Sequence, residues 1–573
     1  MTTFEVKPQL WSSLKNYNRK NFMSDLLAGI IVGIVALPLA IAFGIASGVT
    51  PEKGIITAIV AGLIVSLFGG SKVQIGGPTG AFIVIIYGII QQYGMEGLTI
   101  ATLMAGAFLI LFSLLHLGTI IKYIPYPIVV GFTSGIAVTI FTTQVKDLLG
   151  LSIDKVPSDF TEKWICYFQH FGTIDLWCAI IGIASVVLIA LWPKFTKLSI
   201  IDQHIGWLKR IPGSLIAIIV MTIAVLLLKS YAGITTIETI GDRFTISNEM
   251  PDAAVPNMNW DVIKSLVSPA ITIAVLGAIE SLLSATVADG VIGAHHNSNT
   301  ELMAQGIANI ASPLFGGIPA TGAIARTMTN INNGGKTPIS GIIHAAVLLL
   351  IFLFLMPLAK YIPMACLAGV LVIVSYGMCG WRSFMSIMKN PKSDILVLWV
   401  TFLLTIIFDL TVAIEVGLVC ACLLFMRRMA ETTDVKVIYG EINPDEETPE
   451  FELGNLEHLI IPKGVEVYEI NGPYFFGAGN KFEEIMSGIG DHPKVRIIRM
   501  RKVPFIDSTG IHNLTNLCSL SKSNGIEVVL SGVNEKVLVS LHKAGFKEML
   551  GEENICKHIS LALERANQIL DEK

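Results

Sequence analysis

Long apolar stretches separated by short polar segments occupy the chain from about residue 24 to Arg428. A membrane-spanning helix needs about 20 predominantly apolar residues, and fewer where the helix is broken. Two short apolar segments follow the Gly- and Pro-containing runs GGPTG (Gly76–Gly80) and PATG (Pro319–Gly322). With these two, the pattern predicts about 14 crossings. The other expected spans are 24–47, 52–69, 98–117, 126–149, 173–193, 212–230, 267–290, 300–316, 339–358, 364–379, 394–411 and 412–427.

The pattern changes after Arg428, where charged and apolar residues become mixed. Strand-like stretches at 465–470, 495–500 and 526–532 alternate with amphipathic stretches at 478–489, 508–522, 534–545 and 553–571. This alternation predicts a small α/β domain. We therefore expect four regions: an N-terminal segment 1–23, a transmembrane domain 24–430, a linker 431–452 and a soluble domain 453–573.

Composition supports a membrane protein and excludes several other classes. Of the 573 residues, 53% are hydrophobic and only 15% are charged, whereas soluble domains carry about 25% charged residues. The net charge of −4 gives no indication of a nucleic-acid partner. The eight cysteines lack metal-type spacing, so we expect buried thiols and no metal site.

Loop charges predict the orientation of the spans. Lysines and arginines favour the cytoplasmic side of a membrane. The acidic residues gather in two loops, 150–172 and 231–266, which we expect outside. Both termini are then expected on the cytoplasmic side. We expect the protein itself to lie in the inner (plasma) membrane of the cell. His295 and His296 fall in a predicted inner loop, where we expect them to be solvated.

The two Gly- and Pro-containing runs occupy the third position of each seven-segment half. Matched broken segments of this kind indicate a transporter site near the middle of the membrane. An odd number of spans per half inverts the halves and points two half-helix N-termini toward the site. Such N-termini favour an anion, whereas simple helix kinks are the alternative reading. The candidate anion-binding residues in these runs are Gly77, Thr79, Gly80, Thr321 and Gly322.

Two charged residues lie within the apolar segments and add chemistry to this site. Arg326 lies one turn into the second half-helix, and Glu280 lies within span 267–290. Charges inside a membrane are costly and mark pathways or paired sites. Arg326 would attract the anion, and Glu280 would carry a coupled proton or bind a cation. Ser284 lies one turn further on the same helix face. The alternative is a structural Glu280–Arg326 ion pair.

Four runs of the sequence resemble the SulP anion transporters, relatives of the animal anion exchangers and prestin. They are DLLAGIIVGIVALPLAIAFGIASG (25–48), GGPTGAF (76–82), GFTSGIAVTIFTTQVKDLLG (131–150) and GGKTPISGIIHA (334–345). The resemblance implies two inverted seven-segment repeats, a core domain that moves against a gate domain, and a homodimer. It implies sulfate, bicarbonate, chloride or dicarboxylates as substrates.

The resemblance also assigns roles to residues. The family's anion site falls on Thr79, Gly322, Ala323 and Arg326. The cation site of its sodium-dependent bicarbonate members falls on Glu280 and Ser284. Ile324 stands where those members have a threonine. Leu39 stands where many relatives have Gln or Glu, which excludes a proton-carrying role there.

The soluble tail resembles a STAS domain through PFIDSTGIHNL (504–514). Asp507 or Ser508 is expected to cap the helix that begins there. Related soluble domains are phosphorylated at this turn, so Ser508 is a candidate regulatory residue. The resemblance also implies a cytoplasmic protein partner for this domain.

These features predict a secondary active anion transporter that works by alternating access. No phosphate-binding loop of the Walker type is present, and no constellation of catalytic residues indicates an enzyme. We expect no cofactor, and Na⁺ or H⁺ as the coupling ion. The alternatives are a nucleobase carrier of similar fold, and an anion channel or sensor.

Overall fold

The structure is a computed structural model of the chain. It describes residues 7–15, 17–119, 124–153, 156–157, 159–196, 211–249, 251, 256, 260–408, 410–438, 441–442, 459–477 and 493–572. The chain forms two compact units, Met1–Val419 and Cys420–Lys573. The boundary between them falls within one helix, α18 (Leu410–Thr432).

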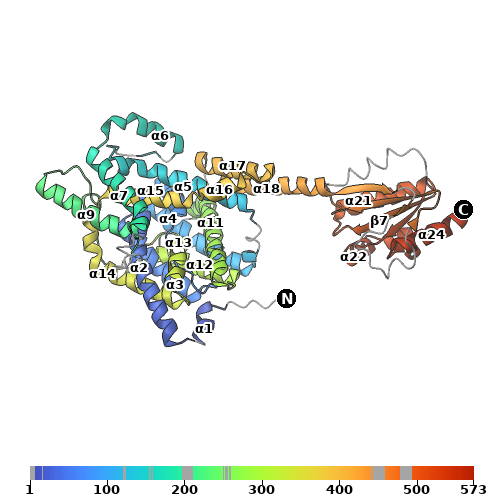
Figure 1. Cartoon of the computed structure of the whole chain (residues 1–573), viewed down its shortest axis with the longest axis horizontal. Coiled ribbons are helices and arrows are strands. Elements are labelled where there is room, and N and C mark those ends of the chain that lie inside the picture. Colours follow the sequence, from blue (N-terminus) through green and yellow to red (C-terminus); the bar gives the residue numbers. More distant parts are fainter. Residues whose placement is uncertain are drawn as a thin grey trace. The chain divides into compact units, whose positions relative to one another are not determined.

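The first unit is helical (Figure 1). In the part of the chain that the structure describes, nine helical segments are long and apolar enough to cross a membrane. The total of about 14 crossings stays a prediction, because α12, α13 and α17 have only 17, 9 and 16 residues. The helices are α1 (Gln9–Leu14), α2 (Arg19–Ala46), α3 (Pro51–Phe68), α4 (Ile83–Leu114), α5 (Tyr126–Leu149), α6 (Phe160–Gln169), α7 (Leu176–Phe195), α9 (Gly213–Tyr231), α10 (Ile240–Arg243), α11 (Trp260–Ile292), α12 (Ser298–Leu314), α13 (Ile324–Asn332), α14 (Ile339–Leu355), α15 (Met364–Met378), α16 (Trp381–Ile387) and α17 (Lys392–Ile407).

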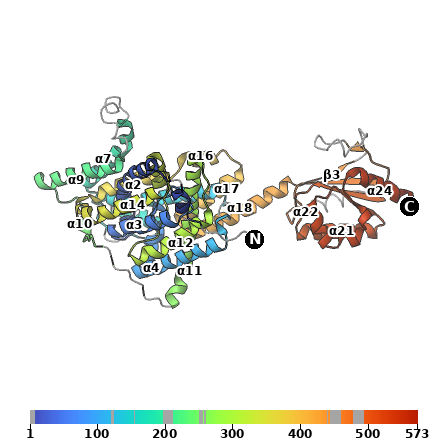
Figure 2. The ribbon, with the colours of Figure 1, turned by 90° about the horizontal axis from the view of Figure 1, so that it is seen from below.

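These helices pack as two groups. In one group α2, α3 and α14 pack together, and α4 packs against α11 and α12 (Figures 1 and 2). In the other group α5 packs against α15 and α17, and α7 packs against α9 and α15. The groups meet where α5 and α15 face α2 and α4.

The first broken segment forms the short helix that the sequence predicts. A 3₁₀ turn (Gly80–Phe82) leads into α4, and Gly94, with φ 69° and ψ −170°, interrupts α4 between Tyr93 and Met95. The interruption divides α4 into a half-helix and the span that was expected at 98–117. The second broken segment leads into α13, which starts at Ile324.

The second unit contains a five-stranded sheet with the strand order β3-β6-β7-β8-β9. Strands β6 to β9 run parallel, and β3 is antiparallel to β6. Helices α21 and α22 lie on one face and α24 lies on the other (Figure 2). The strands are β3 (Asp434–Ile438), β6 (Val465–Asn471), β7 (Val495–Lys502), β8 (Glu527–Ser531) and β9 (Ile555–Cys556), with a separate pair β4 (Glu441–Ile442) and β5 (Leu459–Ile460). The helices are α21 (Ser508–Ser523), α22 (Glu535–Lys543), α23 (Phe546–Leu550) and α24 (Ile559–Glu572).

One part of the predicted linker 431–452 is instead a strand of this sheet. Residues 434–438 form β3 and pair with β6. The strand was missed because it is only five residues long and precedes an acidic, Pro-containing stretch. The expected helix at 478–489 lies outside the described residues, as does most of 439–452.

Candidate functional site

The two broken segments meet as a two-residue antiparallel ladder. Strand β1 (Gly76–Gly77) pairs with β2 (Thr321–Gly322), and the Ala323 N–H donates to the Ile75 carbonyl at 2.9 Å. A helix begins within three residues of each strand, and neither N-terminus has a side-chain cap. The first-turn N–H groups of a helix have no partner within it. Two sets of backbone donors are therefore placed beside one short ladder, which is the arrangement expected of an anion site.

Arg326 holds the backbone of the first broken segment. Its side chain is buried, with 1% exposed. One guanidinium nitrogen donates to the Pro78 carbonyl and another to the Gly76 carbonyl at 3.5 Å. Between them, Gly77 has φ +150°, and a Cβ there would lie 2.0 Å from Nη1 of Arg326. The glycine is thus required both by its backbone conformation and by the approach of the guanidinium.

Glu280 reaches the same place from α11. Its Oε2 accepts a hydrogen bond from the Thr79 hydroxyl at 2.8 Å. In the described part of the chain, Glu280 makes no ion pair with Arg326 within 4.0 Å. The Thr321 hydroxyl donates to the Gly277 carbonyl of α11 at 2.9 Å. Both candidate threonine hydroxyls therefore direct their proton to α11, and the available donors are backbone N–H groups.

Ser284 lies on the same helix but faces α13. Its hydroxyl lies 3.3 Å from the Thr327 hydroxyl, which accepts the Ile75 N–H at 3.1 Å. Thr327 was not identified from the sequence, although it lies one turn after Ala323 on a helix already singled out. Ile324 at the start of α13 is 38% exposed and offers no side-chain oxygen.

A network of buried hydrogen bonds connects the residues before the first broken segment with α11 and α12. The Gln74 amide donates to the Ser281 hydroxyl at 2.8 Å. Glu301 of α12, fully buried, accepts the Gly70 N–H at 2.8 Å and the Ser281 hydroxyl at 3.3 Å. These residues were not identified from the sequence. The available signal was a glutamine two residues before Gly76 and a glutamate in the expected span 300–316.

A Gly322→Ala variant tests whether the position of the Gln74 side chain matters for transport. A Cβ at Gly322 would lie 1.6 Å from the amide nitrogen of Gln74, so the side chain of Gln74 must move. We expect anion uptake to fall at least about tenfold, because small misplacements of a binding site have large effects. The measurement is initial uptake rate in proteoliposomes. Gly88→Ala is the matched control, because nothing lies within 4 Å of its Cβ; equal rates for the two variants would contradict the prediction.

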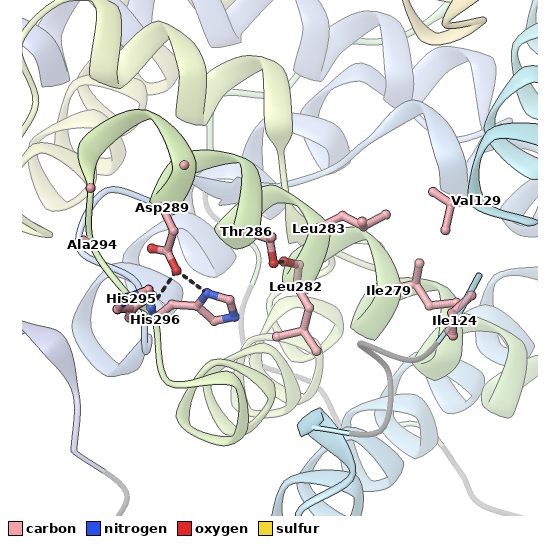
Figure 3. Close-up of a pocket in the computed structure, with 12 residues that line it drawn as sticks. Ile124, Val129, Ile279, Leu282, Leu283, Thr286, Asp289, Ala294, His295 and His296 are labelled. Carbon is pink, nitrogen blue, oxygen red and sulfur yellow. Dashed lines mark hydrogen bonds and ion pairs between the residues drawn. The ribbon is translucent and has the colours of Figure 1, made fainter. Parts of the chain in front are cut away.

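A cavity of about 820 Å³ follows the C-terminal half of α11 (Figure 3). It is lined by Ile279, directly before Glu280, and extends past Leu282, Leu283 and Thr286 to His296. The cavity therefore extends along α11 from Ile279 to the loop that follows this helix.

His296, which lines one end of this cavity, is not solvated as the sequence predicts. Asp289 accepts both the backbone N–H and the ring Nδ1 of His296 at 2.7 Å, and the His296 side chain is 4% exposed (Figure 3). The prediction that both histidines are solvated is thus wrong for His296, because the loop after α11 folds back on Asp289. His295 is exposed.

In the second unit, Asp507 rather than Ser508 caps α21. Its two carboxylate oxygens accept the Gly510 N–H at 2.7 Å and the Phe476 N–H at 3.1 Å. Ser508 is the exposed first residue of the helix. The hydroxyl is thus accessible, and its regulatory role stays a prediction.

Removal of this cap should loosen α21 locally. An Asp507→Ala variant is expected to lose about 1 kcal/mol of helix stability, because the cap's backbone partners lose their acceptors. The measurement is amide hydrogen exchange of the full chain, with faster exchange at 507–515 than in the wild type. Ser508→Ala is the control, and unchanged exchange in Asp507→Ala would contradict the role of the cap.

Broken helices with uncapped N-termini inside an apolar bundle, joined in sequence to a small α/β domain, define a membrane anion transporter. Residues 22–401 match the sulfate permease family and residues 459–566 match the STAS domain. The chain belongs to the sulfate permease family. It is a multi-pass membrane protein, and its relatives are transporters rather than enzymes.

Relatives and a solved structure extend over nearly the whole chain. The Bacillus subtilis protein named "Putative sulfate transporter YvdB" is 38% identical, over 95% of this chain and 98% of its own. The bicarbonate transporter BicA of Synechocystis sp. is 30% identical, over 96% of this chain and 94% of its own. The structure of the murine anion transporter Slc26a9 in its inward-facing state has a TM-score of 0.83 at 18% identity, over 98% of this chain and 94% of its own, and shows the same fold.

Proposed function

We propose that the protein is a secondary carrier that moves a small inorganic anion by alternating access. The anion binds to the backbone N–H groups that begin at Gly80 and Ile324. The observation that carries this proposal is the ladder of β1 and β2 with two uncapped N-termini beside a fully buried arginine. Relatives named for sulfate and bicarbonate support these two anions as substrates.

Glu280 gives this site a means of coupling. When its carboxylate is ionised, it holds the Thr79 proton and offsets the positive charge of Arg326. When it is neutralised, the Thr79 hydroxyl can turn its proton to an anion, and the field of Arg326 and the two helix dipoles becomes attractive. An anion and a cation should therefore be bound together.

We propose a proton rather than Na⁺ as this cation. Hard cations need several oxygen ligands. Ile324 provides none, and the hydroxyl of Ser284 lies against Thr327. A sodium-dependent uptake would contradict this part of the proposal.

The orientation that loop charges predict places both termini in the cytoplasm. The 820 Å³ cavity along α11 then opens to the cytoplasmic side. We further propose a homodimer and a cytoplasmic partner of the STAS domain, as the family resemblance implies.

Competition for uptake into proteoliposomes tests the proposed substrate class. Radiolabelled sulfate and bicarbonate are supplied with unlabelled sulfate, bicarbonate, chloride, succinate or uracil, under imposed proton or sodium gradients. Saturable uptake that anions inhibit and an inward proton gradient stimulates is expected. Inhibition by uracil alone would instead indicate a nucleobase carrier.

A further inference from the structure

A second, smaller cavity lies near the other end of the bundle. It measures about 120 Å³ and lies between α2, α4, α5 and α15, beneath the loop helix α6. Sites for drug-sized ligands measure about 300–1,000 Å³, so this cavity suits only a small ion. Its polar lining residues are Tyr87, Thr143, Gln144, Lys146, Asp147 and Lys163.

Lys163 of α6 is a buried cation that contacts no group of opposite charge among the residues that the structure describes. Its side chain is 6% exposed, and its ammonium lies 5.6 Å from the centre of the Tyr87 ring. Within the described ranges, the ammonium makes no hydrogen bond or ion pair. Burial lowers the pKa of Lys163, and Asp159 only partly opposes this. A buried charge of this kind is costly unless a ligand pairs with it.

The other charged groups of the cavity are already engaged. The Lys146 ammonium donates to the Ile153 carbonyl at 2.5 Å. The Asp147 carboxylate accepts two hydrogen bonds from Arg243, at 2.9 and 3.3 Å, and Arg243 also donates to Glu238 at 2.6 Å. The residues that line the cavity therefore carry two ammonium groups, Lys146 and Lys163, against one carboxylate, that of Asp147. That combination selects an anion rather than a cation.

The cavity lies close, along two helices, to the proposed anion site at the ladder of β1 and β2, which we call the central site. A Cβ at Gly80 would lie 3.1 Å from Ile140 of α5 and 3.5 Å from Phe43 of α2. Thr143, one turn after Ile140, and Ala42, next to Phe43, line the small cavity. Val129, nearer the start of α5, lines the 820 Å³ cavity. The two cavities therefore lie toward opposite ends of α5, on either side of Ile140, which lies beside Gly80.

We propose that the cavity beneath Lys163 is a second anion site, which holds the transported anion between the central site and the membrane side at the C-terminal end of α5. This inference rests on the proposed function, because a carrier of small anions supplies the ligand. Loop charges predict that this side is the outer one.

Transport kinetics of the full chain test this site. In Lys163→Met we expect the KM for external sulfate to rise about tenfold with kcat little changed, because a charge-assisted contact is lost. Lys163→Arg should restore a KM near that of the wild type. Lys360→Met is the control, since Lys360 lies 4.8 Å from the Tyr361 ring but is exposed. An unchanged KM in Lys163→Met, or an equal rise in Lys360→Met, would overturn the proposal.

Binding without transport separates this proposal from the proposed function. Sulfate is titrated calorimetrically into two purified variants. The first is Arg326→Ala, in which the central site has lost the guanidinium that positions its backbone, and the second combines Arg326→Ala with Lys163→Met. Sulfate binding in the first and its loss in the second would support the second site even if no uptake is found. Equal binding by the two variants would refute it, whether or not the wild type transports sulfate.

Discussion

Anion uptake by an Arg326→Ala variant is expected to fall at least about a hundredfold, because the backbone of the central site loses the group that positions it. The guanidinium donates to the carbonyls of Gly76 and Pro78 and lies against Gly77. Without it, two buried carbonyls lose their donor and the first half-helix loses its fixed N-terminus. The positive charge beside the proposed anion site is lost at the same time.

Initial rates of radiolabelled sulfate uptake in proteoliposomes give the measurement. Arg326→Lys is expected to be intermediate, since one ammonium keeps the charge but does not reproduce the planar fork. Arg382→Ala, on the exposed side of α16, is the matched control and should transport normally. Gel filtration and thermal unfolding show whether each variant is folded. A folded Arg326→Ala variant with normal uptake would contradict the role given to Arg326.

Replacement of Glu280 with glutamine should abolish proton-driven accumulation. The amide oxygen can still accept the Thr79 hydroxyl, which donates at 2.8 Å in the wild type, so the site keeps its shape. The side chain can no longer gain or lose a proton. We therefore expect Glu280→Gln to exchange sulfate down its gradient but not to concentrate it.

The measurement is the ratio of internal to external sulfate under an inward proton gradient. In Glu280→Gln this ratio should stay near that without a gradient. Glu415→Gln, on the exposed face of α18, removes another carboxylate of the membrane domain and should not alter the ratio. Gradient-dependent accumulation that persists in Glu280→Gln would assign the coupling to a different group.

The membrane helices could largely be predicted because an apolar stretch of sufficient length has few alternatives. The expected span 126–149 coincides with α5, and 364–379 with α15. Strand β3 could not be predicted from the sequence. Only one of its five side chains is buried, so the alternation of apolar and polar residues that marks a strand is too short to recognise. Its identity as a strand depends on β6, which is more than twenty residues away.

The sequence proposes residues for the candidate site, and only the structure gives the contacts between them. Arg326 and Thr79 were identifiable because a charge and a Gly–Pro break are rare in apolar segments. Arg326 donates a hydrogen bond to the Pro78 carbonyl, which lies 248 positions away in the sequence. This contact could not be predicted, because it depends on the pairing of β1 with β2. Gln74 and Thr327 are ordinary polar residues in sequence, and only the fold places them beside Gly322 and Ser284.

Counterflow tests the central claim most directly. Proteoliposomes are loaded with concentrated unlabelled sulfate, diluted into radiolabelled sulfate without an imposed gradient of protons, and sampled over time. A carrier with its anion site at the ladder of β1 and β2 should show a transient accumulation of label above equilibrium in the wild type, and none in Arg326→Ala. Label that only rises to equilibrium in the wild type, or the same overshoot in Arg326→Ala, would contradict the account.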